Sequence, residues 1–437
     1  MLKVWNTLHR RLEAFTPIHA PRVGLYTCGP TVYNPVTIGN WRAFLFDDLI
    51  RRSLTFLGYE VTHVMNITDV GHLVGDGDEG EDKVERAAAQ RGVDAWRLAR
   101  SLEEDFRQGM KQLNIRTPEV MPRVTAHIAE QIALVQELER KGYTYQTSDG
   151  VYFDTSKFPA YGSLSGQRLE EKKEGARVDV NVEKRHPSDF ALWKYSPTHG
   201  KRQMEWDSPW GVGFPGWHLE CSALSVKYLG QPFDIHAGGV DHIAVHHENE
   251  IAQSEAAFGK PLAHYWLHNE FLLVDGKRMG KSEGNAYTLD DLVERGFDPL
   301  AYRYYCLGTH YRSKLNFTWE GMEQAQQAWK KLRAIAQSLP RTNRNSEDVA
   351  AESFHFESFR LALFDDFNSP QALAAMWEML KSDRLPEKKT TLLLSMDGVM
   401  GFGLDQFVGH PVDIPVSVRN LAEERRQARA RKDWEGS

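Results

Sequence analysis

RVGLYTC at residues 22–28, followed at once by GPTVYNP at residues 29–35, is the stretch that decides the fold. The first segment is a short, apolar, β-prone run, which predicts a buried strand, and the second predicts a loop. From Thr37 onwards apolar residues recur at helical spacing until Gly58, a residue that commonly ends a helix. A second β-prone run covers residues 59–67. Strand, loop, helix and strand in this order predict the start of a parallel α/β sheet.

The polar residues that follow these strands predict where a ligand binds. In parallel sheets ligands sit at the carboxyl ends of the strands, against helix N-termini whose free N–H groups attract phosphate. Cys28 and Thr68 stand at two such strand ends, and residues 37–40 stand at such a helix start. The sequence therefore predicts a nucleotide site at this edge of the sheet.

A dense group of potential metal ligands lies further along, in FPGWHLECSALS at residues 214–225 and DIHAGGVDHIAVHHENE at residues 234–250. His246 and Glu250 are four residues apart, so on a helix both project from one face. Cys221 supplies a third candidate ligand and Cys28 a fourth, and this set suits a tetrahedral zinc ion. Spacing alone leaves open that His246 and Glu250 are a solvated surface pair, because the usual paired-cysteine zinc signatures are absent.

Between these two regions the pattern predicts an insertion that contains a small β-rich unit. Helical patterns cover residues 95–113 and 123–141, and residues 141–154 alternate with period two around an Asp149-Gly150 turn. The acidic stretch at 75–82 lacks the spacing of a calcium loop and is interpreted, like residues 166–185, as a solvated loop. We expect the second half of the main sheet to resume near Trp206, with a strand at 233–237.

The C-terminal third begins with a basic, glycine-rich loop and then becomes helical. A strand at 271–274 leads into residues 276–285, which are either a polyphosphate-binding loop or an ordinary exposed hairpin tip. Residues 319–339 and 359–382 have the pattern of amphipathic bundle helices. The basic stretch at 422–432 suits single-stranded RNA, and equally suits a solvated terminal helix.

Composition limits the class of protein. The 437 residues are 41% hydrophobic and 26% charged, with a net charge of −7, as in an ordinary soluble multidomain protein without a bulk basic excess. Three cysteines cannot make a disulfide framework, so we expect a cytoplasmic protein. No apolar run is long enough to span a membrane, and the N-terminus lacks a secretory pattern.

Several long motifs, in order along nearly the whole chain, resemble the cysteinyl-tRNA synthetases, a family of class I aminoacyl-tRNA synthetases. They are YTCGPTVYN at 26–34, NITDVG at 66–71, GWHLECSA at 216–223, HHENEIAQSEA at 246–256, HYRSKLNF at 310–317 and DDFNSP at 365–370. The resemblance implies a Rossmann-type parallel-sheet catalytic domain with a β-rich insertion, followed by an α-helical bundle. The domains it implies are a first catalytic half at 1–123, a connective insertion at 124–205, a second catalytic half at 206–268, a mobile signature loop and stem-contact region at 269–325, and a helical anticodon-side domain at 326–437.

The resemblance also implies an activity. Cysteine reacts with ATP to give an enzyme-bound adenylate, and the cysteinyl group then passes to the 3′ end of its cognate tRNA. One zinc ion per chain selects the cysteine thiolate, Mg²⁺ accompanies ATP, and positioning with charge stabilisation supplies most of the acceleration. Because zinc separates a thiolate from a hydroxyl far better than an apolar pocket does, we expect no editing site.

Individual roles follow from the resemblance, position by position. The zinc ligands are Cys28, Cys221, His246 and Glu250, and the cysteine site adds Thr68, Trp217 and His236 to Cys28. The residues that hold ATP are Thr37, Ile38, Gly39, Asn40, Gly238, Gly239, Asp241, Arg278, Met279, Gly280, Lys281 and Ser282. Catalysis falls to Lys281, Thr37 and Asn40, and Arg429 and Trp434 meet the anticodon.

The chain departs from the family pattern in three places. Thr37 replaces the first histidine of the His-Ile-Gly-His signature, and Gly280 replaces a serine of the Lys-Met-Ser-Lys-Ser loop, so we expect altered ATP contacts without loss of ATP binding. The sequence also stops at Ser437, earlier than the family pattern. From this we expect intact adenylate formation with weaker tRNA affinity or specificity, which equal charging by a chain carrying the family's C-terminus would contradict.

Other functions remain to be weighed. A ligase that joins cysteine to a small amine such as an amino-sugar would share the zinc and nucleotide sites, but has no use for HYRSKLNF or a long bundle. A weakly active tRNA-binding paralogue would show no cysteine-dependent pyrophosphate exchange. A zinc hydrolase requires a His-Glu-x-x-His spacing that the sequence lacks. The partners expected are L-cysteine, ATP and cysteine tRNA, with no membrane, and we expect a monomer.

Overall fold

A central four-stranded parallel sheet organises the computed structural model, which describes residues 1–70, 83–166, 182–197, 202–280, 283–342, 354–410 and 416–431. Its strand order is β10-β9-β3-β4, with β3 at Arg22–Thr27, β4 at Glu60–Met65, β9 at Phe233–Gly239 and β10 at Ala263–Asn269. All three pairings are parallel. The predicted parallel sheet is therefore confirmed, and strands from distant parts of the chain end at one edge.

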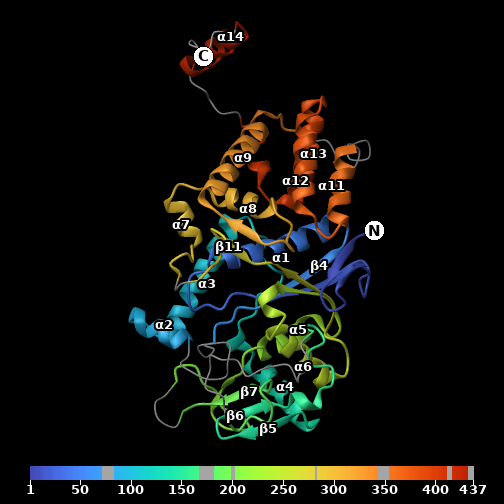
Figure 1. Cartoon of the computed structure of the whole chain (residues 1–437), viewed down its shortest axis with the longest axis vertical. Coiled ribbons are helices and arrows are strands. Elements are labelled where there is room, and N and C mark those ends of the chain that lie inside the picture. Colours follow the sequence, from blue (N-terminus) through green and yellow to red (C-terminus); the bar gives the residue numbers. More distant parts are fainter. Residues whose placement is uncertain are drawn as a thin grey trace.

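Helix α1, Ile38–Phe56, crosses from this sheet to the rest of the molecule (Figure 1). Thr37 caps its first turn by accepting a hydrogen bond from the backbone N–H of Asn40, and Gly58 follows its end at φ 92°, where a glycine is favoured. Most of its apolar residues are buried, and so are four charged ones, Arg42, Asp47, Asp48 and Arg52. A helix with buried charges on its faces must meet partners on several sides.

The insertion carries a second, antiparallel sheet of order β5-β6-β7-β8, at the lower end of the molecule in Figure 1. The predicted hairpin is confirmed, with β5 at Thr144–Thr147 and β6 at Gly150–Phe153. The remaining elements of this part are α2 (Lys83–Arg91), α3 (Ala95–Gln112), η1 (Val124–His127), α4 (Ile128–Arg140), η2 (Thr155–Lys157), β7 (Phe190–Tyr195) and β8 (Gly213–Pro215). The prediction that the main sheet resumes near Trp206 is wrong: Trp206 bridges to Gly213, whose strand β8 pairs with β7 in this antiparallel sheet, and the chain rejoins the central sheet only at β9. The acidic stretch at 75–82 and most of 166–185 lie outside the described residues.

The remaining strands form two further small sheets. β1 (Lys3–Asn6) pairs with β2 (Arg11–Ala14), and a three-stranded sheet has the order β12-β11-β13. In the latter, β11 is Leu272–Val274, β12 is Lys277–Arg278 and β13 is Leu315–Phe317. The helices that flank the site and this sheet are α5 (Leu219–Leu229), η4 (Val240–His242), α6 (His246–Phe258), α7 (Leu289–Glu294) and α8 (Pro299–Leu307).

The C-terminal part is helical, as predicted, but the single helix expected at 359–382 is divided into two helices. Residues 359–382 form the end of α11 (Phe354–Phe364) and then α12 (Ser369–Lys381). Asp366 and Phe367 adopt positive φ, and Asn368 caps α12, which has a proline in its first turn. These local features end a helix although the apolar spacing continues through them.

The other bundle elements are α9 (Trp319–Ser338), α13 (Pro386–Met400), η6 (Leu404–Gln406) and α14 (Val416–Ala430). Helix α14 stands apart from the bundle at the C-terminal end (Figure 1). Across the described residues, no helix combines the length and the apolar character that crossing a bilayer requires.

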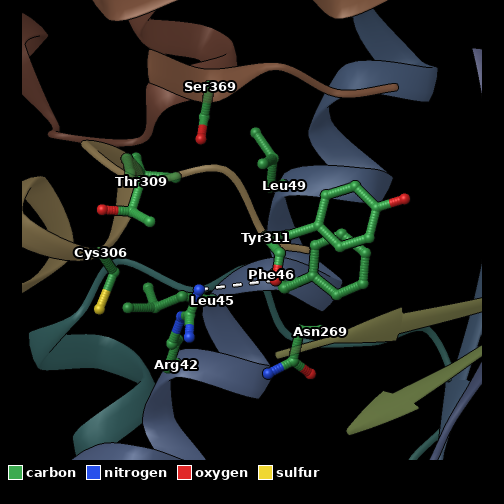
Figure 2. Close-up of a pocket in the computed structure, with 10 residues that line it drawn as sticks. Arg42, Leu45, Phe46, Leu49, Asn269, Cys306, Thr309, Tyr311 and Ser369 are labelled. Carbon is green, nitrogen blue, oxygen red and sulfur yellow. Dashed lines mark hydrogen bonds between the residues drawn. The ribbon is translucent and has the colours of Figure 1, made fainter. Parts of the chain in front are cut away.

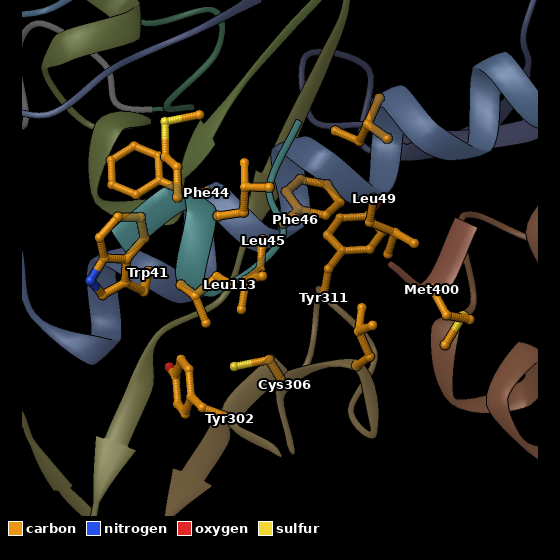
Figure 3. Close-up of a cluster of buried hydrophobic side chains, with 14 of the residues drawn as sticks. Trp41, Phe44, Leu45, Phe46, Leu49, Leu113, Tyr302, Cys306, Tyr311 and Met400 are labelled. Atoms are coloured by element: carbon orange, nitrogen blue, oxygen red, sulfur yellow. The ribbon is translucent and has the colours of Figure 1, made fainter. Parts of the chain in front are cut away.

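A single apolar core joins the central sheet, the three-stranded sheet and the bundle, with α1 at its centre (Figure 3). The Phe46 ring stacks on Tyr311 with centroids 4.1 Å apart, and Trp41 stacks on Phe106 at 5.2 Å. A second core fills the space between the central sheet and the insertion. Helix α1 is therefore the element that holds three parts of the molecule in register.

Candidate active site

Four side chains from distant parts of the sequence converge beyond the ends of β3 and β9. They are Cys28, Cys221, His246 and Glu250, whose ligand atoms all lie within 4.8 Å of one another. The two sulfur atoms are 3.9 Å apart, and Nε2 of His246 lies 3.1 Å from Oε1 of Glu250. The predicted i, i+4 pair is therefore part of a buried cluster that could hold a metal ion, and the surface-pair interpretation is wrong.

Backbone packing fixes the position of Cys28. The next residue is Gly29, where an added Cβ would lie 1.6 Å from the carbonyl oxygen of Asn66, so only glycine lets the chain pass here. The amide side chain of Asn66 accepts from the Gly29 N–H at 3.0 Å, and its Oδ1 lies 3.7 Å from the Cys221 sulfur. Asn66 therefore ties the two cysteines together from the end of β4.

A neighbouring histidine orients His246. Nδ1 of His218 lies 2.7 Å from Nδ1 of His246, which directs Nε2 of His246 toward Glu250 and the thiols. This Nε2 is buried and makes no hydrogen bond within the described part of the chain. His218 itself has φ 86°, in the left-handed region that a bulky residue rarely adopts. Strain of this kind is typical of functional sites, and here it aims an imidazole.

The two carboxylate oxygens of Glu250 face different partners. Its Oε2 bonds to Nε2 of His236 at 2.8 Å, which leaves Oε1 facing His246 and, at 3.8 Å, Cys28. Burial opposes ionisation, but the neighbouring imidazoles outweigh it and lower the pKa of Glu250 to about 2. His236, expected to contact the amino acid, thus also holds a candidate ligand in place.

The protonation of the cluster follows from its burial. Burial raises the pKa of Cys28, and the nearby Cys221 and Glu250 raise it further. Burial acts against protonation of His246, yet Cys221 and Glu250 raise its pKa well above the usual range. In this cluster the thiols, the imidazole and the carboxylate hold protons that a divalent cation can displace when it binds.

A second combination also satisfies metal-ligand geometry among the described residues. His236 and His247 can replace Cys221 and His246, while Cys28 and Glu250 are common to both sets. However, Nε2 of His236 is engaged by Glu250, and Nδ1 of His247 bonds to His268 at 2.8 Å. Burial and neighbouring imidazoles lower the pKa of His247 well below its ordinary value. The combination with Cys221 offers two sulfurs instead of one, so it is the better soft-metal site.

The predicted amino-acid contacts surround this cluster. Thr68 is buried, and its Oγ1 accepts from the side chain of Asn66 at 2.9 Å. The Trp217 ring lies 5.3 Å from that of His246, centroid to centroid, and stacks on His218 at 4.8 Å. The structure therefore brings Cys28, Thr68, Trp217 and His236 to one place.

The two segments expected to hold ATP also meet. An added Cβ at Gly39 would lie 3.4 Å from Sδ of Met279, so the start of α1 is packed against the residue that follows β12. Thr37 bridges to Thr288, and its hydroxyl donates to Oδ1 of Asn40 at 2.8 Å. Ile38 is buried, whereas Asn40 and Arg278 are exposed and Gly280 is half-buried. In this first turn the Ile38 N–H donates to the carbonyl of Tyr287 and the Asn40 N–H donates to Thr37. The Gly39 N–H is therefore the group that an anion can approach without displacing a described partner.

The glycines after β9 have a structural cause. An added Cβ at Gly238 would lie 2.6 Å from Nδ1 of His242, and one at Gly239 would lie 2.2 Å from Asp241. Both glycines thus allow close packing of the histidine cluster, whether or not they contact adenosine. Lys281, Ser282 and Trp434 lie outside the described residues, and Arg429 is exposed on α14, far from the cluster (Figure 1).

Two residues that organise the site, Asn66 and His218, were given no role by the sequence analysis. Both lie in motifs that it quoted, NITDVG and GWHLECSA, next to assigned residues. Their function is to hold other side chains, which spacing in one sequence does not reveal.

Comparisons with known proteins agree with this geometry. Residues 14–327 match the family model described as "tRNA synthetases class I (C) catalytic domain". The chain is 50% identical to cysteine–tRNA ligase 1 of Burkholderia lata over 99% of its own length and 91% of that protein, and 41% identical to cysteine–tRNA ligase of Thermus thermophilus over 100% and 94%. The fold also matches methionyl-tRNA synthetase of Mycobacterium tuberculosis in complex with methionyl-adenylate, with a TM-score of 0.57, 17% identity and coverage of 92% and 93%. The chain therefore belongs to the class I aminoacyl-tRNA synthetases, in the family of the cysteine–tRNA ligases.

Proposed function

We propose that this chain ligates L-cysteine to its cognate tRNA in two steps, through an enzyme-bound cysteinyl adenylate. The observation that carries the proposal is the four-residue cluster of Cys28, Cys221, His246 and Glu250, just past the end of β3, the strand from which the chain leads on into α1. A thiol-binding metal site and a helix N-terminus, which attracts phosphate, would then serve one reaction. The names of the relatives at 41% and 50% identity support the same activity.

The donor set supports zinc as the metal. Two thiols, one imidazole and one carboxylate are borderline-soft ligands, and all of them are buried except Cys28, which is half-buried. Zinc held by these residues would bind the thiolate of cysteine, which serine cannot supply. The chain itself would keep Trp217 and Thr68 beside the bound cysteine, where they exclude water and limit the size of the substrate's side chain.

The nucleotide half of the proposal rests on the N-terminus of α1. Gly39 in its first turn packs against Met279, and its N–H has no partner among the described residues, so it can receive an ATP phosphate, with Mg²⁺ bound to the nucleotide. The Thr37 hydroxyl, which bonds to Asn40, can exchange that bond for one to a phosphate oxygen. We assign Lys281 and Asn40 to the charge that develops on the leaving pyrophosphate, with Ser282, Arg278 and Gly280 in the same loop. Gly238, Gly239 and Asp241 would border the adenosine.

The tRNA half rests on the C-terminal part. Arg429 lies on the exposed face of a basic helix, α14, at one extremity of the molecule, and we assign it together with Trp434 to the anticodon (Figure 1). The domain boundaries given above, a monomeric state and a cytoplasmic location complete the proposal. Free Cys28, Cys221 and Cys306 support a reducing compartment.

Exchange of labelled pyrophosphate into ATP tests the first step directly. We expect exchange that depends on cysteine, that serine does not support, and that a zinc chelator abolishes. Charging of cysteine tRNA tests the second step and separates the proposal from a ligase that acts on a small amine. Exchange without charging of any cysteine tRNA would contradict the proposed function.

A further inference from the structure

Arg42 is a buried cation whose role is not explained by the metal or nucleotide contacts. It lies on α1, two residues after Asn40, and is only 3% exposed. Among the described residues it forms no ion pair with a carboxylate, and its guanidinium donates to backbone carbonyls instead. A buried charge neutralised only by main-chain dipoles is costly unless its geometry is well defined.

The carbonyls that surround Arg42 come from two separate segments. Nη1 donates to the oxygens of Glu270 and Phe271 at 2.7 and 2.6 Å, where the chain enters β11. Nη2 donates to Ser313 at 2.5 Å and, at longer range, to His310 and Tyr311, where the chain enters β13. Figure 2 draws the bond from Arg42 to Tyr311. Because β11 pairs with both β12 and β13, Arg42 holds the base of the three-stranded sheet.

That sheet carries one half of the proposed ATP site, and α1 carries the other. Strand β12 ends at Arg278, immediately before Met279, which packs on Gly39 in the first turn of α1. A displacement of the sheet along α1 would therefore change the distance between the two ATP segments. Arg42 is one turn from Gly39 and controls that displacement through a planar, five-donor fork.

The space around Arg42 is too small for a ligand. The cavity beside it measures ≈ 20 Å³, room for about one water molecule. Asn269 lines this cavity, and its buried Oδ1 has no hydrogen-bond partner in the described part of the chain (Figure 2). Arg42 is thus a structural cation inside the protein, and the cavity beside it has no room for a substrate.

We propose that Arg42 is a positioning residue for adenylate formation, which sets the register of the signature-loop sheet against the ATP-binding turn of α1. It acts through backbone carbonyls and touches neither substrate. The proposal rests on the proposed function, because it concerns the ATP half of the same site. The candidate metal ligands of the cysteine half lie just after β3 and on α5 and α6, and none of the hydrogen bonds described for the Arg42 guanidinium reaches them.

Substitution with lysine provides the test, and the same helix provides a matched control. Arg42→Lys keeps the charge but cannot span both pairs of carbonyls. Arg51 is also on α1 and also donates to two carbonyls, those of Arg116 and Thr117, in a loop that is not part of the three-stranded sheet. Pyrophosphate exchange would be measured for the unaltered chain, Arg42→Lys, Arg42→Gln and Arg51→Lys, with KM for ATP and for cysteine, kcat, zinc content and unfolding temperature.

We expect Arg42→Lys to raise KM for ATP, or lower kcat, by roughly tenfold, the effect of losing about one charge-assisted hydrogen bond. KM for cysteine and the zinc content should stay as in the unaltered chain, and Arg51→Lys should change none of these. Arg42→Gln should shift the same parameter further, in whatever fraction folds. Equal losses for Arg42→Lys and Arg51→Lys, parallel increases in both KM values, or a lower unfolding temperature with unchanged kinetics would each overturn the proposal. If the unaltered chain shows no cysteine-dependent exchange, the proposed function itself fails.

Discussion

The metal-ligand cluster and the start of α1, two regions that the chain reaches from the end of β3, are built in opposite ways. In the cluster, the candidate ligands are almost entirely enclosed, and Asn66, His218 and His236 hold them from behind. At the start of α1, Asn40 is exposed, and the opposing segment with Met279 belongs to a different sheet. The proposed amino-acid half of the site is therefore preorganised within one core, whereas the proposed nucleotide half depends on two parts of the molecule keeping their relative position.

This difference has a consequence for how each half responds to substitution. A preorganised buried site loses function when one ligand or its support is changed, because no alternative donor can approach. A site assembled from two surfaces loses affinity gradually, because each surface retains its own fold. Substitutions in the cluster should therefore abolish activity, and those at the helix start should reduce it.

Cys221→Ser should have the largest effect. The hydroxyl is a much weaker zinc ligand than a thiolate, so we expect loss of bound zinc and a fall in exchange greater than the roughly 100-fold cost of losing an outer contact. Zinc content and cysteine-dependent exchange measure it. Cys306→Ser is the matched control, since Cys306 is also buried and free but lies on α8. Full zinc content in Cys221→Ser would favour the alternative combination with His247.

His218→Asn should come next. Asparagine tolerates the left-handed backbone at this position but cannot place a ring nitrogen against His246. We expect zinc affinity to fall by about 10- to 100-fold, as seen when the outer partner of a ligating histidine is removed. Competition with a chelator of known affinity measures it. His127→Asn, a buried histidine that bonds Tyr228 outside the site, should leave zinc affinity unchanged. A similar loss in both variants would indicate general destabilisation.

Thr37→Ala should have a smaller effect, confined to ATP. It removes the N-cap of α1, worth about 1 kcal/mol, and a hydroxyl beside the phosphate-binding turn. We expect KM for ATP to rise a few-fold, with KM for cysteine unchanged. Thr318→Ala removes the equivalent cap of α9 and should leave both values as they were. An increase in KM for cysteine would show that the two halves are less independent than their construction suggests.

Asp397 should influence stability and leave activity almost unchanged, the smallest effect of the four. It is buried in α13, and burial raises its pKa from 3.8 to about 6, against the backbone N–H groups of Phe402 and Leu404 that favour the charged form. Since the folded state binds the proton more tightly than the unfolded chain, the free energy of unfolding should fall as pH rises from about 4 to about 6.

Asp397→Asn removes this titration, so the difference in unfolding free energy between the variant and the unaltered chain should change across that window, by on the order of 3 kcal/mol. Chemical denaturation at several pH values measures it. A pH-independent difference would contradict the assigned cause.

Sequence patterns predicted the parallel sheet and the four candidate ligands, because strands and an i, i+4 pair are local features. Sequence patterns failed where the backbone ends a helix although the apolar spacing continues. At 359–382 this spacing predicts one helix, but Asp366 and Phe367 adopt positive φ and α11 ends before them. They also could not assign Asn66 or His218, because these residues act through contacts between segments far apart in the sequence. The sequence did not predict the role of Arg42 either, because its partners are backbone carbonyl groups, which every residue carries.

The most direct test of the proposed metal site is X-ray absorption at the zinc edge, recorded with and without L-cysteine. The cluster predicts two sulfur ligands, from Cys28 and Cys221, in the free protein and one more when cysteine binds. Addition of serine should leave the spectrum unchanged. A zinc environment without sulfur, or one that cysteine does not alter, would contradict the conclusion that this cluster selects the substrate through its thiolate.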